Sequence, residues 1–80
     1  MELFQKVSLA KDLEKYGLKK GDVATLIDFI DNPDGGEQGC ILEVLNALGE
    51  SINVITVPFS YIESLKSDEI LSVRVYSKAV

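Results

Sequence analysis

Clusters of glycine, proline, asparagine and aspartate interrupt this chain, and the segments between them are rich in β-branched and aromatic residues. The sharpest interruption is Asn32-Pro33-Asp34-Gly35-Gly36. Pro33 sets φ for a turn position, and Gly35 accepts the left-handed conformation that follows. The cluster separates residues 23–31 from residues 40–45, so we expect these two segments to form a β-hairpin. The pattern predicts a mainly β protein.

Three more segments have strand composition. Residues 5–9 and residues 51–57 alternate or concentrate aliphatic side chains, and Pro58 stops the second of them. Residues 70–76 alternate Leu71, Val73 and Val75 with polar side chains. This last segment is expected to be the final strand.

Two connecting segments have a different character. Phe59, Ile62 and Leu65 recur at intervals of three, which predicts one helical turn across residues 59–65, plugging an end of the sheet. Residues 11–22 contain two glycines and two leucines and are expected to form a long ordered loop, with a single helical turn ended by a glycine as the alternative.

These elements together predict the fold. The sequence indicates a mainly β protein with the plan of a small five-stranded SH3-like barrel, in which one short helical turn precedes the last strand. Eighty residues, of which 46% are hydrophobic, suffice for one domain with one core, so residues 1–80 are expected to form a single SH3-like β-barrel domain.

The charge of the chain limits its partners. The formal net charge is −5, and an acidic surface opposes nucleic acid and anionic lipid, which are bound through lysine and arginine. The apolar runs are far shorter than the roughly 20 residues that cross a bilayer, and the first residues do not resemble a secretion signal. One cysteine fits a reducing compartment. We expect a soluble, cytoplasmic protein that binds neither nucleic acid nor membrane.

Side chains for catalysis are scarce. The chain has no histidine, and Cys40 alternates with Leu42 and Val44, a pattern that favours core packing over nucleophilic chemistry. The carboxylates around the first hairpin lack the spacing of a calcium loop. We therefore expect no enzyme activity, no catalytic or metal site and no cofactor.

Several strands have aliphatic side chains at successive positions, which cannot share one face of a sheet. If Cys40 and its alternating neighbours point inward, Ile41 and Leu45 point outward, and we assign Ile55 to the same outer set. Tyr61 and Tyr76 are added as aromatic contacts. These five residues are the predicted protein interface, for a partner or for a homodimer. The alternative is that residues 59–65 or the N-terminal Leu3-Phe4 cover the outer set.

One stretch resembles a known family. The run Asp12-Leu13-Glu14-Lys15-Tyr16-Gly17-Leu18-Lys19-Lys20-Gly21-Asp22-Val23-Ala24-Thr25-Leu26, with Val54-Ile55-Thr56-Val57-Pro58, resembles the bacterial domain-of-unknown-function family 4926. The same glycine turn before a strand resembles KOW-type barrels, although Ala24 stands where the second glycine is expected. The resemblance implies a small barrel and no activity.

The predicted function follows from these observations. We expect a small acidic protein-binding module, whose concrete form is an antitoxin or immunity-like inhibitor, with a protein partner or self-association. An accessory or structural subunit of a larger complex is the alternative, and a small enzyme is the weakest interpretation.

Overall fold

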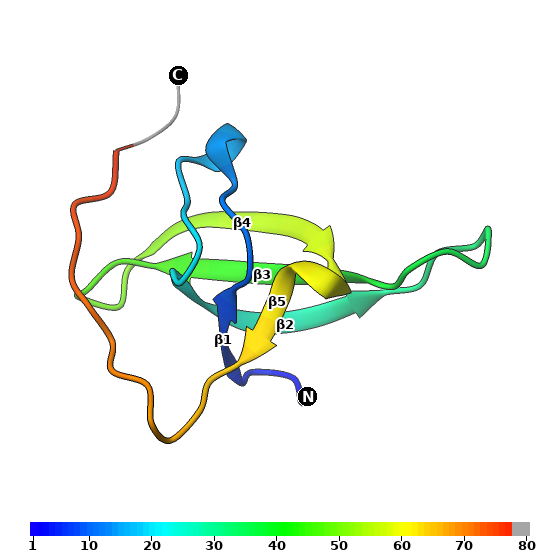
Figure 1. Cartoon of the computed structure of the whole chain (residues 1–80). Coiled ribbons are helices and arrows are strands. Elements are labelled where there is room, and N and C mark those ends of the chain that lie inside the picture. Colours follow the sequence, from blue (N-terminus) through cyan, green and yellow to red (C-terminus); the bar gives the residue numbers. More distant parts are fainter. Residues whose placement is uncertain (78–80) are drawn as a thin grey trace.

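Five antiparallel strands form one curved sheet in the order β4-β3-β2-β1-β5 (Figure 1). The computed structural model describes residues 1–77. Two short 3₁₀ turns interrupt the strands, and the second immediately precedes the last strand. The elements are β1 (Lys6–Leu9), η1 (Glu14–Tyr16), β2 (Val23–Ile30), β3 (Gly39–Leu45), β4 (Ser51–Pro58), η2 (Phe59–Tyr61) and β5 (Ile62–Ser64). The fold is the predicted five-stranded SH3-like barrel.

The core fills the inside of the curved sheet. Leu26 of β2, Leu42 of β3 and Ile55 of β4 lie opposite one another across three neighbouring strands, and all three are buried. Burial of such aliphatic side chains is the main favourable term in folding. The full set of buried apolar residues is Val7, Leu9, Leu18, Ala24, Leu26, Cys40, Leu42, Val44, Ile55, Val57 and Ile62.

Two β-bulges reconcile this core with strands that are aliphatic at neighbouring positions. The β2–β3 register shifts between Leu26 and Asp28, so that Leu26 and Phe29 both reach the core although they are three residues apart. The β3–β4 register shifts between Val44 and Leu45, where Ile52 is passed over and packs against the core. A bulge inserts one extra residue into a strand, so side chains before and after it can face the core at positions that strict alternation would place on opposite faces.

The prediction of residues 70–76 as the last strand was wrong. The fifth strand is the three-residue β5, which pairs with β1 through Leu9↔Ile62 and Val7↔Ser64. The predicted helical turn across residues 59–65 is correspondingly shorter and is limited to η2. Because β5 follows η2 directly, it reaches the free side of β1 before residues 70–76 do. These later residues run outside the sheet without strand structure.

The loop between β1 and β2 is ordered, and it contains the helical turn that was the alternative expectation. η1 ends at Gly17, whose left-handed φ of 69° lets its N–H donate to the Glu14 carbonyl. Leu13 and Leu18 pair across the turn, and Leu18 is buried in the core. The leucine therefore anchors the loop, as the sequence suggests.

No helix in residues 1–77 is long and apolar enough to cross a membrane.

Candidate protein-docking surface

The side of β2, β3 and β4 that faces away from the core carries a mixture of aliphatic and acidic side chains. The strand register places Asp28, Ile41 and Thr56 in one row and Thr25, Glu43 and Val54 in the next. Residues in one row are direct cross-strand neighbours, with Cβ atoms about 5 Å apart. We call this surface the outer β2–β4 face, and its members are Thr25, Asp28, Ile30, Ile41, Glu43, Val54 and Thr56.

Aliphatic groups on the outer β2–β4 face are open to solvent. The side chain of Val54 is 53% exposed, Ile30 is exposed, and Ile41 between them is half-buried. Single exposed aliphatic residues are ordinary, but neighbours on one sheet face form a patch. The patch lies on three paired strands of one sheet.

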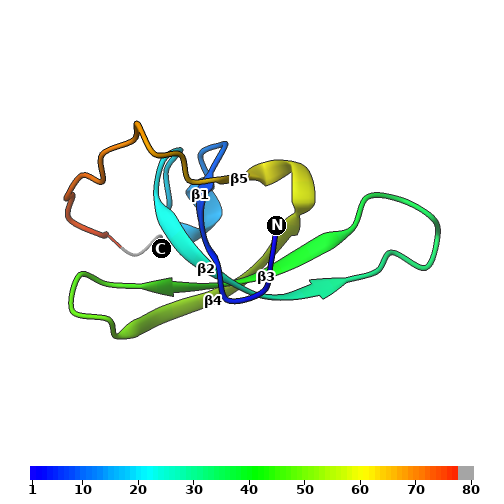
Figure 2. The same cartoon turned by 90° about the horizontal axis from the view of Figure 1, so that it is seen from below.

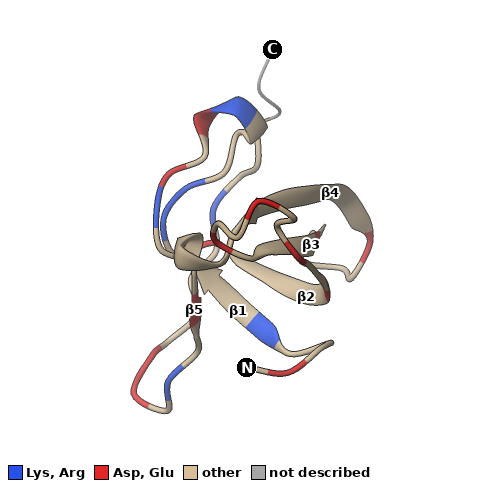
Figure 3. Ribbon diagram, turned by 90° about the vertical axis from the view of Figure 1, so that its right-hand side faces the viewer, with Lys and Arg blue, Asp and Glu red and all other residues tan. Residues whose placement is uncertain are grey.

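The charged side chains around this face are mostly acidic, although Lys6 of β1 lies opposite Thr25. No lysine or arginine occurs between Lys20 and Lys66, whereas that interval holds eight aspartates and glutamates. Figure 3 shows the acidic residues on β2, on β3 and in the turns that join β2, β3 and β4, with the basic residues toward β1, the loop before β2 and the C-terminal segment. The β2–β4 half of the chain is therefore more acidic than the net charge of −5 for the whole chain suggests.

The predicted outward position of Ile55 was wrong. Ile55 is 2% exposed and lies opposite Leu42 in the core, while its neighbour Val54 takes the outward position. The pairing of β4 with β3 fixes this phase, because Glu43 faces outward opposite Val54. Val54 is thus a surface residue that the sequence analysis missed. The sequence alone allows either Val54 or Ile55 to face outward, because both are aliphatic. The bulge at Ile52 and the pairing with β3 decide between them.

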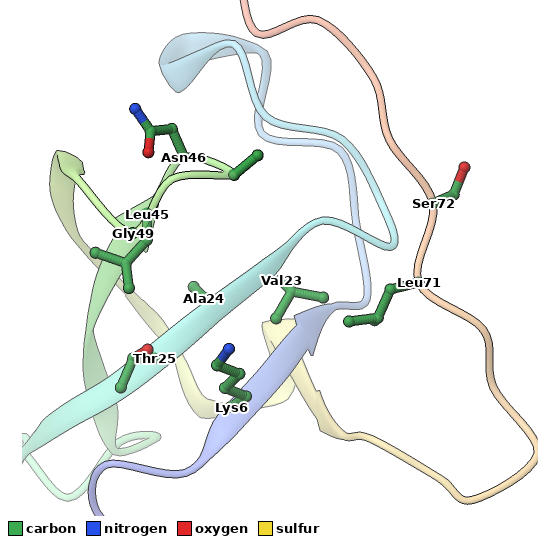
Figure 4. A pocket seen from close by; sticks show the side chains of 10 residues that line it. Lys6, Val23, Ala24, Thr25, Leu45, Asn46, Gly49, Leu71 and Ser72 are labelled. Atoms are coloured by element: carbon green, nitrogen blue, oxygen red, sulfur yellow. The ribbon is translucent and has the colours of Figure 1, made fainter.

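Ile41 and Leu45 both lie on the outward side of β3, as predicted, but in different surroundings. Leu45 lies beside a groove of about 350 Å³ that separates the start of β2 from the C-terminal segment. Figure 4 shows Val23 and Leu71 pointing toward one another across this groove. Ile41 lies farther along β3, between Asp28 and Thr56. Only the Ile41 end of the strand belongs to the uncovered patch.

The two predicted aromatic contacts are separate from this patch. Tyr61 of η2 packs against the core, and the Lys11 ammonium lies 4.5 Å from the centre of its ring. Tyr76 also packs against the core, and its hydroxyl donates to the carbonyl of Tyr16 at 3.1 Å. The five predicted interface residues therefore do not form one continuous surface.

The proposed internal covers leave the outer face open. Phe4 of the N-terminal segment is itself 74% exposed. Phe59 contacts Phe29, with ring centres 6.4 Å apart, and its side chain also remains exposed. These aromatic residues add to the exposed apolar surface instead of reducing it.

The C-terminal segment, residues 65–77, is attached to the loop before β2 by side chains. The Asp22 carboxylate accepts hydrogen bonds from Nε of Arg74 at 2.8 Å and from Nη2, and the carbonyl of Gly17 accepts a further one from Nη2 at 3.2 Å. A two-point contact between guanidinium and carboxylate fixes orientation as well as distance. Figure 2 shows the segment leaving β5 and passing outside the sheet toward this loop.

The ion pair shifts the titration of both partners. Partial burial acts to raise the pKa of Asp22, but the hydrogen bonds from Arg74 and from the Lys19 N–H outweigh it and lower the pKa below its ordinary value of 3.8. The hydrogen bonds that Arg74 donates to Asp22 raise the pKa of the Arg74 guanidinium. Both directions agree that folding favours the charged pair.

Acid is expected to release this attachment. Because the folded pKa of Asp22 lies below 3.8, its stabilising contribution is complete at neutral pH and is lost as the pH falls through the lowered value. Asp22→Asn keeps an acceptor for the Lys19 N–H but removes the charge. We expect it to lower the free energy of unfolding by about 1 kcal/mol at neutral pH, since the pair is partly exposed, and by nothing in strong acid.

Urea unfolding of the unmodified protein and of the Asp22→Asn protein across a pH series measures the difference in their free energies of unfolding. Asp12→Asn is the matched control, because Asp12 also accepts a backbone N–H, from Lys20, without an arginine partner. A difference for Asp22→Asn that persists in acid would contradict the assignment.

Cys40 is a poor nucleophile. It is fully buried between β2 and β4, and burial, followed by the charge of Glu37, raises the pKa of its thiol. Among residues 1–77, no group of three cysteine, aspartate or glutamate side chains is arranged to hold a metal ion. The prominent chemical feature of the described surface is therefore its acidic and aliphatic outer β2–β4 face.

Comparison of the chain with protein-family models, with curated proteins and with solved structures found no match. Membership of family 4926 stays a prediction from the residues quoted above.

Proposed function

We propose that the chain is a small acidic protein-binding module of the cytoplasm, and that its concrete role is that of an antitoxin or immunity-like inhibitor. The observation that carries the proposal is the outer β2–β4 face, where exposed Val54 and half-buried Ile41 lie beside Asp28 and Glu43. Aliphatic groups supply contact area and the carboxylates supply orientation and faster encounter.

The charge distribution supports a partner with a basic surface. A face flanked mainly by carboxylates repels acidic proteins and attracts a surface with lysine and arginine around an aliphatic centre. Proteins that bind or cleave nucleic acid carry such cationic surfaces, because they gain affinity by neutralising phosphates. An inhibitor that covers a cationic surface needs the chemistry that the outer β2–β4 face presents.

Selection from a displayed peptide library tests this proposal without knowledge of the partner. We expect enrichment of peptides that combine lysine or arginine with aliphatic residues, with binding that weakens as salt is added. Amide chemical shifts of the labelled protein should change at Ile41, Val54 and their neighbours.

Val54→Ser is expected to weaken binding of the selected peptides about tenfold, which corresponds to about 1.4 kcal/mol. Leu48→Ser is the matched control, because Leu48 is 85% exposed at the tip of the β3–β4 turn, outside the face. Enrichment of peptides without basic residues, or shifts confined to another surface, would contradict the proposal.

The alternative function is an accessory or structural subunit of a larger complex. The C-terminal segment favours it, because Ile70, Val73 and Val75 are exposed on a segment that runs outside the sheet and holds none of the outer β2–β4 face residues. A subunit that contacts two neighbours needs two surfaces.

A further inference from the structure

Residues 70–76 have the composition of a strand and the environment of a loop. Val73 is 92% exposed, and Ile70, Leu71 and Val75 are exposed as well. Such a run of β-branched and aliphatic side chains normally packs against a sheet. Here the aliphatic side chains of the segment are largely exposed, while Arg74 and Tyr76 make its hydrogen bonds to the rest of the molecule.

The main chain of this segment also lacks main-chain partners. Within residues 1–77, no backbone-to-backbone hydrogen bond joins residues 70–77 to any other part of the chain. The attachment consists of the Arg74 contacts with Asp22 and Gly17 and the Tyr76 hydroxyl on Tyr16. In the part of the chain that the structure describes, the Val75 carbonyl accepts a hydrogen bond from Nη1 of Arg74, and the other backbone N–H and C=O groups of the segment remain available to pair with a strand edge.

The chain itself contains a matching edge. In residues 1–77, β4 pairs with β3 alone, so its other edge is open over the eight residues of the strand. An open edge of this length is a template for another strand. β5, at the other end of the sheet, is only three residues long. β4 is thus the edge on which a seven-residue segment can pair along its length.

Charge favours this pairing between two copies. Residues 70–80 contain Arg74 and Lys78 and no acidic residue, whereas residues 21–65 contain acidic residues and no basic one. β4 itself has no charged side chain, but Glu50 immediately precedes it, and Glu43 lies opposite Val54 on β3. The C-terminal segment of one molecule therefore complements the β2–β4 half of another, although both molecules have a net charge of −5.

We propose that residues 70–76 of one molecule add as a sixth strand to the open edge of β4 in a second copy, and that the exchange is reciprocal. Main-chain hydrogen bonds join the strands, and alternate side chains of the segment extend the two sheet faces. A reciprocal exchange gives a closed two-fold dimer, because each molecule offers one segment and one edge. This dimer lies beside the outer β2–β4 face and goes beyond the binding function proposed above.

Sedimentation equilibrium of the full chain over a wide concentration range tests the dimer. We expect a reversible monomer–dimer equilibrium. Val73→Asp should weaken it at least tenfold, because it places a carboxylate in a strand that pairs with β4 in the acidic half of the second copy. Leu48→Asp is the matched control, since it makes the same charge change at an equally exposed leucine. A chain that stays monomeric at all concentrations, or a dimer that Val73→Asp leaves intact, would overturn the proposal.

Disulfide trapping locates the contact. Val73→Cys and Val75→Cys proteins are each mixed with a Thr56→Cys protein and oxidised, with native Cys40 buried in all of them. Paired strands bring side chains close enough for a disulfide, so at least one mixture should give the mixed covalent dimer. A dimer that yields no mixed disulfide in either mixture overturns the placement on β4. Peptide binding by the Val73→Asp protein separates this proposal from the previous one, because the outer β2–β4 face is unchanged in it.

Discussion

Replacing Leu42 by alanine is expected to lower the free energy of unfolding by about 2–5 kcal/mol, because it leaves a cavity in a core that cannot close around it. Leu42 is fully buried and lies between Leu26 and Ile55 on neighbouring strands. Domains of this size are stable by only about 5–15 kcal/mol, so the variant loses a large part of its stability.

Urea unfolding measured by circular dichroism gives this difference directly. Leu48→Ala is the control, since the leucine lies at the exposed tip of the β3–β4 turn and its loss should change stability by less than about 0.5 kcal/mol. Equal effects at the two leucines would mean that Leu42 is not at the centre of the core.

The thiol of Cys40 is expected to react with a thiol reagent about a thousandfold more slowly in the native protein than in the unfolded chain. Its side chain is fully buried, and burial raises the pKa of the thiol, so reaction requires opening of the barrel. With a stability of about 5 kcal/mol or more, the open state is populated less than one part in a thousand.

A Leu48→Cys protein in a Cys40→Ala background supplies the rate for an exposed thiol. The Leu42→Ala variant provides an internal check, because its loss of stability should speed the reaction of Cys40 by the corresponding factor. Fast reaction of Cys40 in the native protein would show that β3 presents this residue to solvent.

The first four strands were predictable because each has local signals. Turn residues such as Pro33 and Gly35 separate β2 from β3, and β-branched side chains mark both strands. These signals depend on neighbouring residues only, so they predict where a strand lies without information about its partners.

The last strand was not predictable on the same grounds. β5 is three residues long and follows η2, and its spacing of apolar residues resembles a helical turn. Residues 70–76 have the better strand pattern, but the free side of β1 is already occupied by β5. Which segment pairs with the free edge of β1 depends on the arrangement of the whole sheet, and a local sequence pattern carries no information about that arrangement.

The candidate surface was predictable in part. The alternation of Cys40, Leu42 and Val44 correctly places Ile41 and Leu45 outward. The predicted outward position of Ile55 was wrong because the bulge at Ile52 decides which side chains of β4 face the core. This bulge has no clear signal in the sequence. The acidic interval between Lys20 and Lys66 was visible in the sequence, but only the fold gathers it around one sheet.

The pairing of β1 with β5 determines the order in which the molecule assembles in time. β2, β3 and β4 are consecutive hairpins, so their contacts close short loops and form early. The register of β1 on β5 joins Val7 to Ser64, which requires almost the whole barrel to be in place. We infer that the acidic three-stranded meander is the first organised part of the chain, and that β5, the shortest strand, joins the sheet last.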